Sequence, residues 1–226
     1  GLSSFVVGLA ASLKVSVAGN VSVTLLNSIT SSLIDNANIS VNSMDSGSDH
    51  YARSHVMAGS AGIGVATAGV GAAVVVTNDK SQSLAKVNNS KIGINSGYAG
   101  DVKINSNNDD KYDITGFSVG AGLYAGVAGT VAVNYMENQV DTTVASSTIG
   151  TSASRANSVE IKSKDVSTIN TNGGSGALGA AGVGAFVNVD TFDGQTNTSI
   201  SKSKVYSTKD VNLGASEERN SDEFAL

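Results

Sequence analysis

Residues Val127 to Asn134 read VAGTVAVN, and three similar strings occur elsewhere in the chain. They are VAGNVSVT from Val17, VGAAVVVT from Val70 and VGAFVNVD from Val183, which gives separations of 53, 57 and 56 residues. Val occupies the first, fifth and seventh columns of all four strings. Because a fixed internal period changes the meaning of every local motif, we treat the chain first of all as four copies of one repeat.

The Val columns all share one parity, whereas the positions between them vary freely, as in Ala73, Thr130 and Phe186. Alternation with period two is typical of a β-strand that has one buried and one solvated face. We therefore expect the Val columns to point inward. On this assignment Val131→Asp should unfold the protein and Ala132→Asp should be tolerated.

Two more apolar columns follow each string. Eleven residues after the last Val, and then five residues further on, come the pairs Ile34 and Ile39, Val87 and Ile92, Val144 and Ile149, and Ile200 and Val205. Turn-forming residues such as Asn88-Asn89 stand between the two columns, which predicts a corner between two short strands. A third element, D-V-x-I, begins at Asp101 and is repeated as SVEI from Ser158 and DVNL from Asp210, with no clear counterpart in the first copy.

Short β-branched strands that recur about every 56 residues cannot each close a core, and they must stack on their neighbours. The sequence therefore predicts an all-β fold, a right-handed parallel β-helix (solenoid) with about two coils per copy and about eight coils in all. The absence of Pro suits strands that are hydrogen-bonded on both sides. We expect one solenoid segment, 1–226, with copies at approximately 1–56, 57–115, 116–171 and 172–226.

The composition disfavours several classes of function. The chain has no Cys, so disulfides, thiolate metal sites and cysteine nucleophiles are excluded. A net charge of -5 with scattered Lys and Arg makes nucleic acid an unfavourable partner. The stretch from Gly1 to Leu13 does not resemble a signal peptide, and we interpret the chain as a fragment of a longer protein.

Few residues suggest chemistry. His50 and His55 lie close to Asp45 and Asp49, a combination that could hold a divalent metal, but a solvated loop is the simpler interpretation. Gly174 to Gly179 fits the G-x-G-x-x-G pattern of dinucleotide-binding loops, although no amphipathic helix follows it. Residues 105–113, NSNNDDKYD, are rich in oxygen ligands but lack a calcium-loop pattern. We therefore expect no catalytic residue, no metal site and no cofactor.

Three windows without charge raise the question of a membrane: Val56 to Asn78, Ile114 to Met136 and Val166 to Val189. They are rich in Gly, Ala, Ser and Thr rather than Leu, and each contains a set of Val columns. We therefore assign them to the solenoid interior, and membrane contact stays an alternative.

The pattern V-G-x-x-V-x-V-N, followed by T-x-A-x-I and D-V-x-I-x-S, resembles the β-helical regions of large Gram-negative exoproteins. The fusobacterial leukotoxin and filamentous-haemagglutinin-like adhesins are the most similar group. The resemblance is carried by Val127 to Asn134, Thr142 to Ile149 and Ser158 to Ser163 with their repeats, and it extends over nearly the whole chain.

This resemblance implies a secreted or outer-surface toxin or adhesin, exported by two-partner secretion or as an autotransporter, that acts on host cells without being an enzyme. The chain would be a structural shaft whose partners are a host-cell receptor and the neighbouring repeats of the parent protein. We expect exposed loops at Ser43 to Ser54 and Asn105 to Asp113 to contact the host. The alternatives are a membrane-active, pore-forming segment and, less favoured, a glycan-processing β-helix enzyme.

Overall fold

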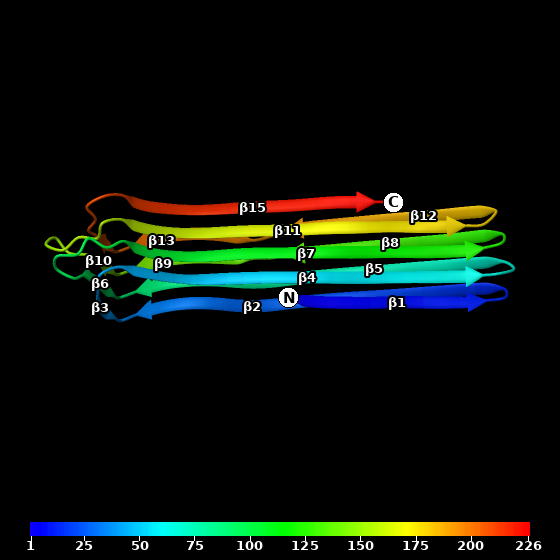
Figure 1. Ribbon diagram of the computed structural model, residues 1–226, viewed down its shortest axis with the longest axis horizontal. Coiled ribbons are helices and arrows are strands. Elements are labelled where there is room, and N and C mark those ends of the chain that lie inside the picture. The colour runs from blue at the N-terminus through cyan, green and yellow to red at the C-terminus, as the bar shows by residue number, and fades with distance from the viewer.

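The computed structural model describes residues 1–226, which form strands and turns and no helix. All strand pairs are parallel, and the strands make three sheets (Figure 1). Sheet A contains β1 (Leu2–Ser12), β4 (Met44–Gly64), β7 (Val102–Gly122), β11 (Val159–Leu178) and β15 (Val211–Ala225). Sheet B contains β2 (Val15–Asp35), β5 (Ala68–Asn88), β8 (Ala125–Met136), β9 (Gln139–Ala145), β12 (Ala181–Phe192) and β13 (Gln195–Ser201). Sheet C contains β3 (Asn38–Val41), β6 (Lys91–Ile94), β10 (Thr148–Ile149) and β14 (Lys204–Val205). The expected all-β class is confirmed.

Each copy of the repeat contributes one layer to the stack. In sheet B, Val74 pairs with Val131 and Val131 pairs with Val187, so equivalent Val residues of successive copies are direct neighbours. The offsets between paired strands lie between 52 and 58 residues in the whole molecule. The expectation of two coils per copy, and of eight coils in all, is therefore wrong. The first copy also has the third element that seemed to be missing, because Met44 pairs with Val102.

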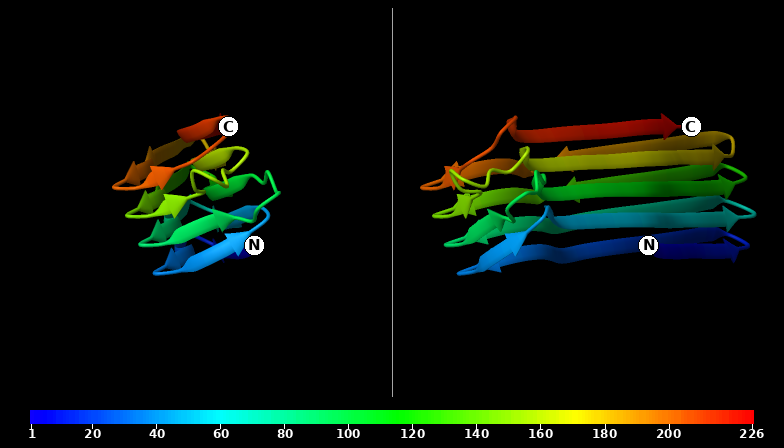
Figure 2. Two further views of the ribbon diagram at one scale, coloured as in Figure 1. Left: turned by 90° about the vertical axis from the view of Figure 1, so that its left-hand side faces the viewer. Right: turned by 60° about the vertical axis from the view of Figure 1, so that its left-hand side comes forward.

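The strands are much longer than the sequence suggested. Each of β2, β4, β5 and β7 has 21 residues, which corresponds to a length of roughly 70 Å at about 3.3 Å per residue. Sheets A and B face each other along this length, and sheet C closes one end, as the turned views show (Figure 2). Each layer therefore has a long axis along its strands and adds only about 4.8 Å to the stack.

The corner between sheets B and C is where the turn formers predicted it. One residue per copy has a positive φ there: Asn36 (50°), Asn89 (46°), Ser146 (50°) and Lys202 (48°). The next Ser along the chain joins neighbouring layers. The Ser147 hydroxyl accepts a hydrogen bond from the Ser90 backbone N–H at 3.1 Å and donates one to the Ala145 carbonyl at 2.7 Å. This arrangement repeats in the next layer, where the Ser147 N–H donates to the Ser203 hydroxyl at 3.0 Å.

The parity that we assigned to the Val columns is wrong. Val131 is 37% exposed and lies on the outer face of sheet B, whereas Ala132 beside it is fully buried. The reason is the close approach of sheets A and B at the end away from sheet C. A Cβ added to Gly120 would lie 1.9 Å from the carbonyl oxygen of Val127, and one added to Gly71 would lie 2.3 Å from that of Val119. Only the smallest side chains fit inside, and the valines point outward.

The interior changes character along the strands. An apolar cluster lies where the three sheets meet, and a second one lies further along sheets A and B. The first includes Val87, Ile104, Val144, Ile149 and Ile161, and the second includes Val56, Val75, Tyr112, Ile114 and Ile169. Between them the inward positions of both sheets are mostly polar, and we call this region the polar band. It contains Ser48, His50, Asp79, Ser81, Ser83, Asn108, Asp110, Asn138, Asp165 and Ser167, all of them buried.

Candidate functional site

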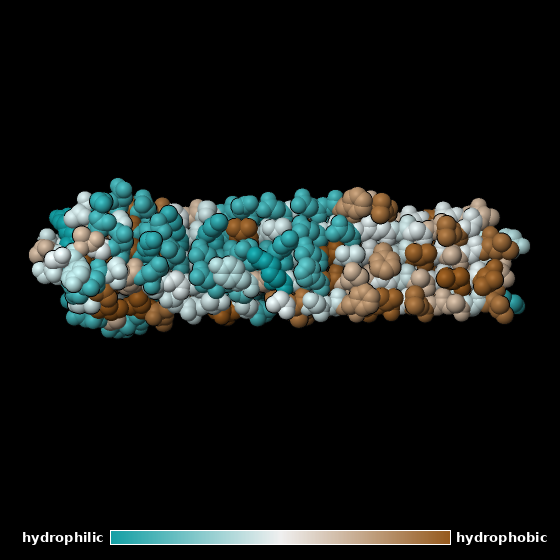
Figure 3. Space-filling view, viewed as in Figure 1, coloured by the Kyte–Doolittle hydropathy of each residue, from teal (hydrophilic) through white to brown (hydrophobic).

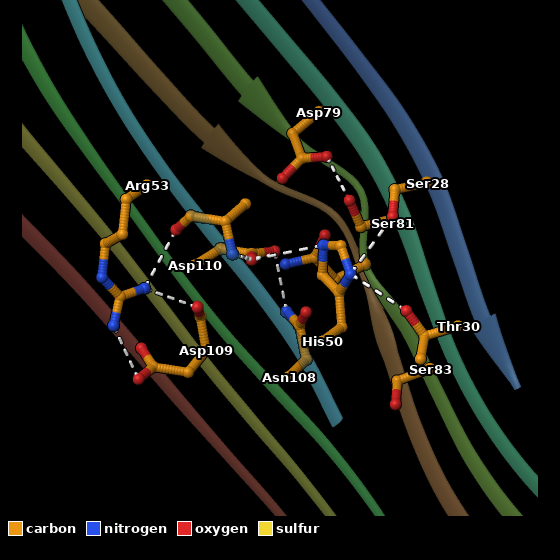
Figure 4. A network of polar contacts seen from close by, with 12 residues as sticks. Ser28, Thr30, His50, Arg53, Asp79, Ser81, Ser83, Asn108, Asp109 and Asp110 are labelled. Atoms are coloured by element: carbon orange, nitrogen blue, oxygen red, sulfur yellow. Dashed lines mark hydrogen bonds and ion pairs between the residues drawn. The ribbon is translucent and has the colours of Figure 1, made fainter. Parts of the chain in front are cut away.

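The polar band holds the most unusual ionisable groups of the protein. Asp79 from β5 and Asp110 from β7 face each other across the interior, and both are fully buried (Figure 4). Asp79 accepts hydrogen bonds from the Tyr112 hydroxyl at 2.7 Å and the Ser81 hydroxyl at 2.5 Å. Asp110 accepts from the Ala52 backbone N–H at 2.9 Å and from the Asn108 side chain at 2.9 Å. The two carboxyl groups therefore have different surroundings.

Burial, and next the negative charge of Asp79, raise the pKa of Asp110 to about 8. Two carboxylates in one dry site cannot both carry a charge at low cost, and one of them retains its proton. At neutral pH Asp110 is thus the protonated member of the pair. Burial also raises the pKa of Tyr112, with a further contribution from the charge of Asp79. The Tyr112 hydroxyl therefore stays a donor to Asp79.

His50 lies at the edge of this network. Its Nδ1 is 3.1 Å from the Ser28 hydroxyl and 3.3 Å from the Thr30 hydroxyl, and its Nε2 is 3.6 Å from Asp110 Oδ1. Burial lowers the pKa of His50, and the charge of Asp79 opposes this effect in part. His50 is therefore a neutral imidazole within a hydroxyl-rich setting.

Asn108 extends the network to the next layer. Its side-chain nitrogen donates to Asp110 at 2.9 Å and to Asp165 at 2.7 Å, and the pKa of Asp165 is raised chiefly by burial. Ser167 donates to Asp165 as well, at 3.3 Å, and Asn138 donates to Ser167 at 3.0 Å. Buried carboxyl groups thus recur in two successive layers and are joined by amide and hydroxyl donors.

A buried acid that keeps its proton beside a second carboxyl group, as Asp110 does beside Asp79, is an arrangement that general acid and base chemistry uses. Such chemistry also needs a substrate within hydrogen-bond reach of the acid. Asp79, Asp110 and Asp165 are each at most 1% exposed, and none of them lines any of the larger hollows. In this structure the acids act as internal hydrogen-bond partners.

The residues that we weighed for metal binding are not brought together. His50 points inward, whereas His55 is exposed and lies 3.4 Å from Asp113. Asp45 and Asp49 lie on the outer face of β4. No group of three or more His, Asp or Glu side chains is placed to hold a metal ion.

Two segments that we expected to be loops are strands. Ser43 to Ser54 falls almost wholly within β4, and Asn105 to Asp113 falls within β7. In β7 the side chains alternate, with Ser106, Asn108, Asp110 and Tyr112 inside and their neighbours outside. Gly174 to Leu178 completes β11, and Gly179 and Ala180 form the turn before β12.

We did not predict the buried acids from the sequence, because we took Asn105 to Asp113 for an exposed loop. A signal was present nevertheless. Asp110 has the same parity as Val102 and Ile104, and Asp79 has the same parity as Val87, an apolar column that we correctly placed inside. If the alternation of inward and outward positions is continued from these apolar residues through the polar ones, it predicts the polar band.

A polar hollow of about 400 Å³ lies on the outer face of sheet B, where β8 ends and β9 begins. Lys80 and Glu137 form an ion pair at 2.8 Å within it, and Gln82, Gln139 and Gln195 of successive layers line it in register. Charge and amide groups of this kind suit contact with a polar surface. No helix in the structure is long and apolar enough to cross a bilayer.

Comparison with known proteins gives no relatives: no family model, no curated protein and no solved structure matches the chain.

Proposed function

We propose that this chain is a segment of a right-handed parallel β-helix that serves as the shaft of a large secreted or surface-exposed bacterial toxin or adhesin. The observation that carries the proposal is the register. Equivalent residues of four copies, such as Val74, Val131 and Val187, are direct neighbours in one ladder, and every copy repeats the same three-sheet path. A unit whose every strand pairs with the same strand of the next copy can be extended indefinitely.

The outermost layers support neighbouring repeats as partners. Val159 and Ile161 of β11 are fully buried, whereas Val211 and Leu213, which pair with them in β15, are about half exposed. A further layer on β15 would cover these side chains and would satisfy the free edge of the strand. The outermost strands of sheets B and C likewise have a free edge that a further layer would pair with.

Contact with a host-cell surface belongs, on this proposal, to the outer face of sheet A nearest sheet C. We call it the polar face of sheet A, and it is the teal half of Figure 3. Asp49 and Asn107 are joined there by a hydrogen bond of 2.7 Å, and Arg53 and Asp109 form an ion pair of 2.8 Å. Exposed groups of both signs on a rigid sheet suit a protein or glycan receptor. The internal position of the acids supports a structural and binding role in preference to an enzyme.

Binding to host cells tests this function. Fluorescently labelled protein should bind leukocytes saturably, and the triple variant Asp49→Ala, Asn107→Ala, Lys111→Ala should bind at least tenfold more weakly, because it removes outward groups of the polar face of sheet A. Gln82→Ala with Gln139→Ala, on the opposite outer face, is the matched control and should bind as the wild type does. Absence of saturable binding to leukocytes and to epithelial cells would refute the host-contact role.

A further inference from the structure

The three charge-free windows come together at one end of the molecule. Each window begins within a sheet A strand, passes through a turn and ends in a sheet B strand, as with β4 and β5. Because the copies are in register, Val56 lies beside Ile114 and Ile114 lies beside Thr171, and from this level to the turns the windows stack on one another. We call this region the uncharged end, and it comprises residues 56–78, 114–136 and 171–189. In Figure 3 it corresponds to the half of the surface that is mostly brown and white.

The uncharged end has its large apolar side chains outside and its smallest ones inside. On the outer face of sheet B, Val127 and Val183 are 44% and 63% exposed. On the outer face of sheet A, Phe117 and Leu178 are 41% and 66% exposed, and at the turns Leu123 is 61% exposed. Two faces and the tip of this end are thus apolar at once. Contiguous exposed apolar surface of this extent marks an interaction site.

The dimensions of this surface match a bilayer. Val56 to Gly64 of β4 and Ala68 to Val76 of β5 are nine residues each, or about 30 Å at about 3.3 Å per residue. The hydrocarbon core of a bilayer is also about 30 Å thick. Charged side chains begin at the edge of this length. They are Asp113 on the outer face of sheet A, Lys80 and Glu137 on that of sheet B, and Glu223 of β15, which pairs with Thr171.

Between neighbouring layers the backbone of the uncharged end is hydrogen-bonded internally, and only the outermost strands have a free edge, which neighbouring repeats would cover. The strands are bonded in ladders, and the turns continue the ladders from layer to layer. Ala66 N–H donates to the Leu13 carbonyl at 2.9 Å, Tyr124 N–H to the Thr67 carbonyl at 3.0 Å, and Ala180 N–H to the Leu123 carbonyl at 3.2 Å. Internal satisfaction of backbone groups is the main structural requirement for entering lipid.

We propose that the uncharged end inserts, turns first, into a lipid bilayer, so that acyl chains contact the outward Val columns of sheet B and the outward Phe and Leu side chains of sheet A. A second protein, or a second copy of this chain, would cover one face of the end and leave the other face and the tip in water. A bilayer covers all three together. Lys14 is the one charged residue in the turns between sheets A and B, and it would reach the far headgroups.

The chain contains no Trp, so a single introduced Trp reports its own surroundings. We choose Val131→Trp, on the outer face of sheet B within the uncharged end, and Gln139→Trp, on the same face beyond it. Each protein is mixed with phosphatidylcholine vesicles, which carry no net charge, and with vesicles whose acyl chains are brominated. The fluorescence emission maximum of Val131→Trp should shift to shorter wavelength, and the brominated chains should quench this fluorescence. The fluorescence of Gln139→Trp should neither shift nor be quenched.

A pair of charge variants separates lipid binding from misfolding. Val131→Asp with Val187→Asp should fold with unchanged circular dichroism and should lose at least tenfold in vesicle affinity by co-flotation, whereas Gln139→Asp should bind as the wild type does. The triple variant Asp49→Ala, Asn107→Ala, Lys111→Ala, which should bind host cells more weakly, should bind vesicles as the wild type does. This result would distinguish lipid insertion from the host-receptor role. No vesicle binding by the wild type would overturn the proposal. Concentration-dependent dimers without lipid, abolished by the same double variant, would also overturn it, because the surface would then belong to a second copy.

Discussion

At the scale of single residues, one interval in the sequence decides which side chains are buried. The last Val of each string and the next apolar column are eleven residues apart, as are Val76 and Val87. Eleven is odd, so the two columns face opposite sides of one continuous strand. We interpreted both columns as inward. The inward position of Val87 was correct, and that of Val76 was wrong.

The corrected parity predicts the reverse of the sequence-based expectation for one pair of substitutions. Ala132→Asp places an unpaired charge at a fully buried position beside Val75 and Ile114, and should lower the unfolding free energy by several kcal/mol. Val131→Asp lies on the outer face and should cost less than about 1 kcal/mol. Urea unfolding of the two variants checks this. Equal midpoints would contradict the side-chain orientations of β8.

The pKa of Asp110 predicts how stability depends on pH. Its folded-state pKa, about 8, lies above the ordinary value of 3.8. Between these values the folded state binds more protons than the unfolded state, so the contribution of Asp110 is complete below about pH 4 and is lost as the pH rises through about 8. In that window the folding equilibrium constant should fall roughly tenfold per pH unit on account of this group.

Asp110→Asn isolates this effect because the amide cannot ionise. Relative to Asp110→Asn, the unfolding free energy of the wild type should fall steadily from pH 5 to about pH 8 and then level off, as measured by urea unfolding. Ser106→Ala removes another buried polar group of the interior, one that does not titrate, and its cost should be the same at every pH. A difference for Asp110→Asn that does not vary with pH would show that this carboxyl is ionised throughout.

At the scale of elements, the sequence located the ends of the strands better than their lengths. The turn formers predicted the corner at Asn89 and Ser146, and the D-V-x-I pattern marked the starts of β7, β11 and β15. Strand length was underestimated because globular strands usually have about 5 to 6 residues. Polar residues in β4 and β7, at Ser43 to Ser54 and Asn105 to Asp113, were taken for loops. Inward and outward positions alternate regularly through these segments, which is the signal of a strand. The signal was hidden because the inward positions are polar there as well.

At the scale of the whole molecule, the repeat predicted a parallel stack and four copies, but not how many layers each copy makes. A count of apolar stretches gave two layers per copy, because the outward Val columns were taken for a second interior. Register is a property of pairs of strands, and a single sequence does not contain it except through the period itself. The 53- to 57-residue period was therefore the better guide to the layer than the stretches within it.

Cysteine cross-linking tests one layer per copy, and the absence of native Cys makes the result easy to interpret. Gln82 and Gln139 pair directly on the outer face of sheet B. Neighbouring parallel strands are about 4.8 Å apart, so Gln82→Cys with Gln139→Cys should form a disulfide under mild oxidation. Gln82→Cys with Asp141→Cys, displaced by two residues, should not. Two layers per copy would separate the first pair by about 10 Å and prevent the bond.

Because each copy forms a single layer, a protein built from this repeat needs many residues for each increase in the height of the stack. Each turn of the chain consumes between 52 and 58 residues and raises the stack by about 4.8 Å. A nanometre of height therefore requires roughly 120 residues. What such a protein gains in return is breadth, since every layer is about 70 Å across. Added repeats therefore extend a broad, flat-sided stack, whose largest surfaces are the outer faces of sheets A and B.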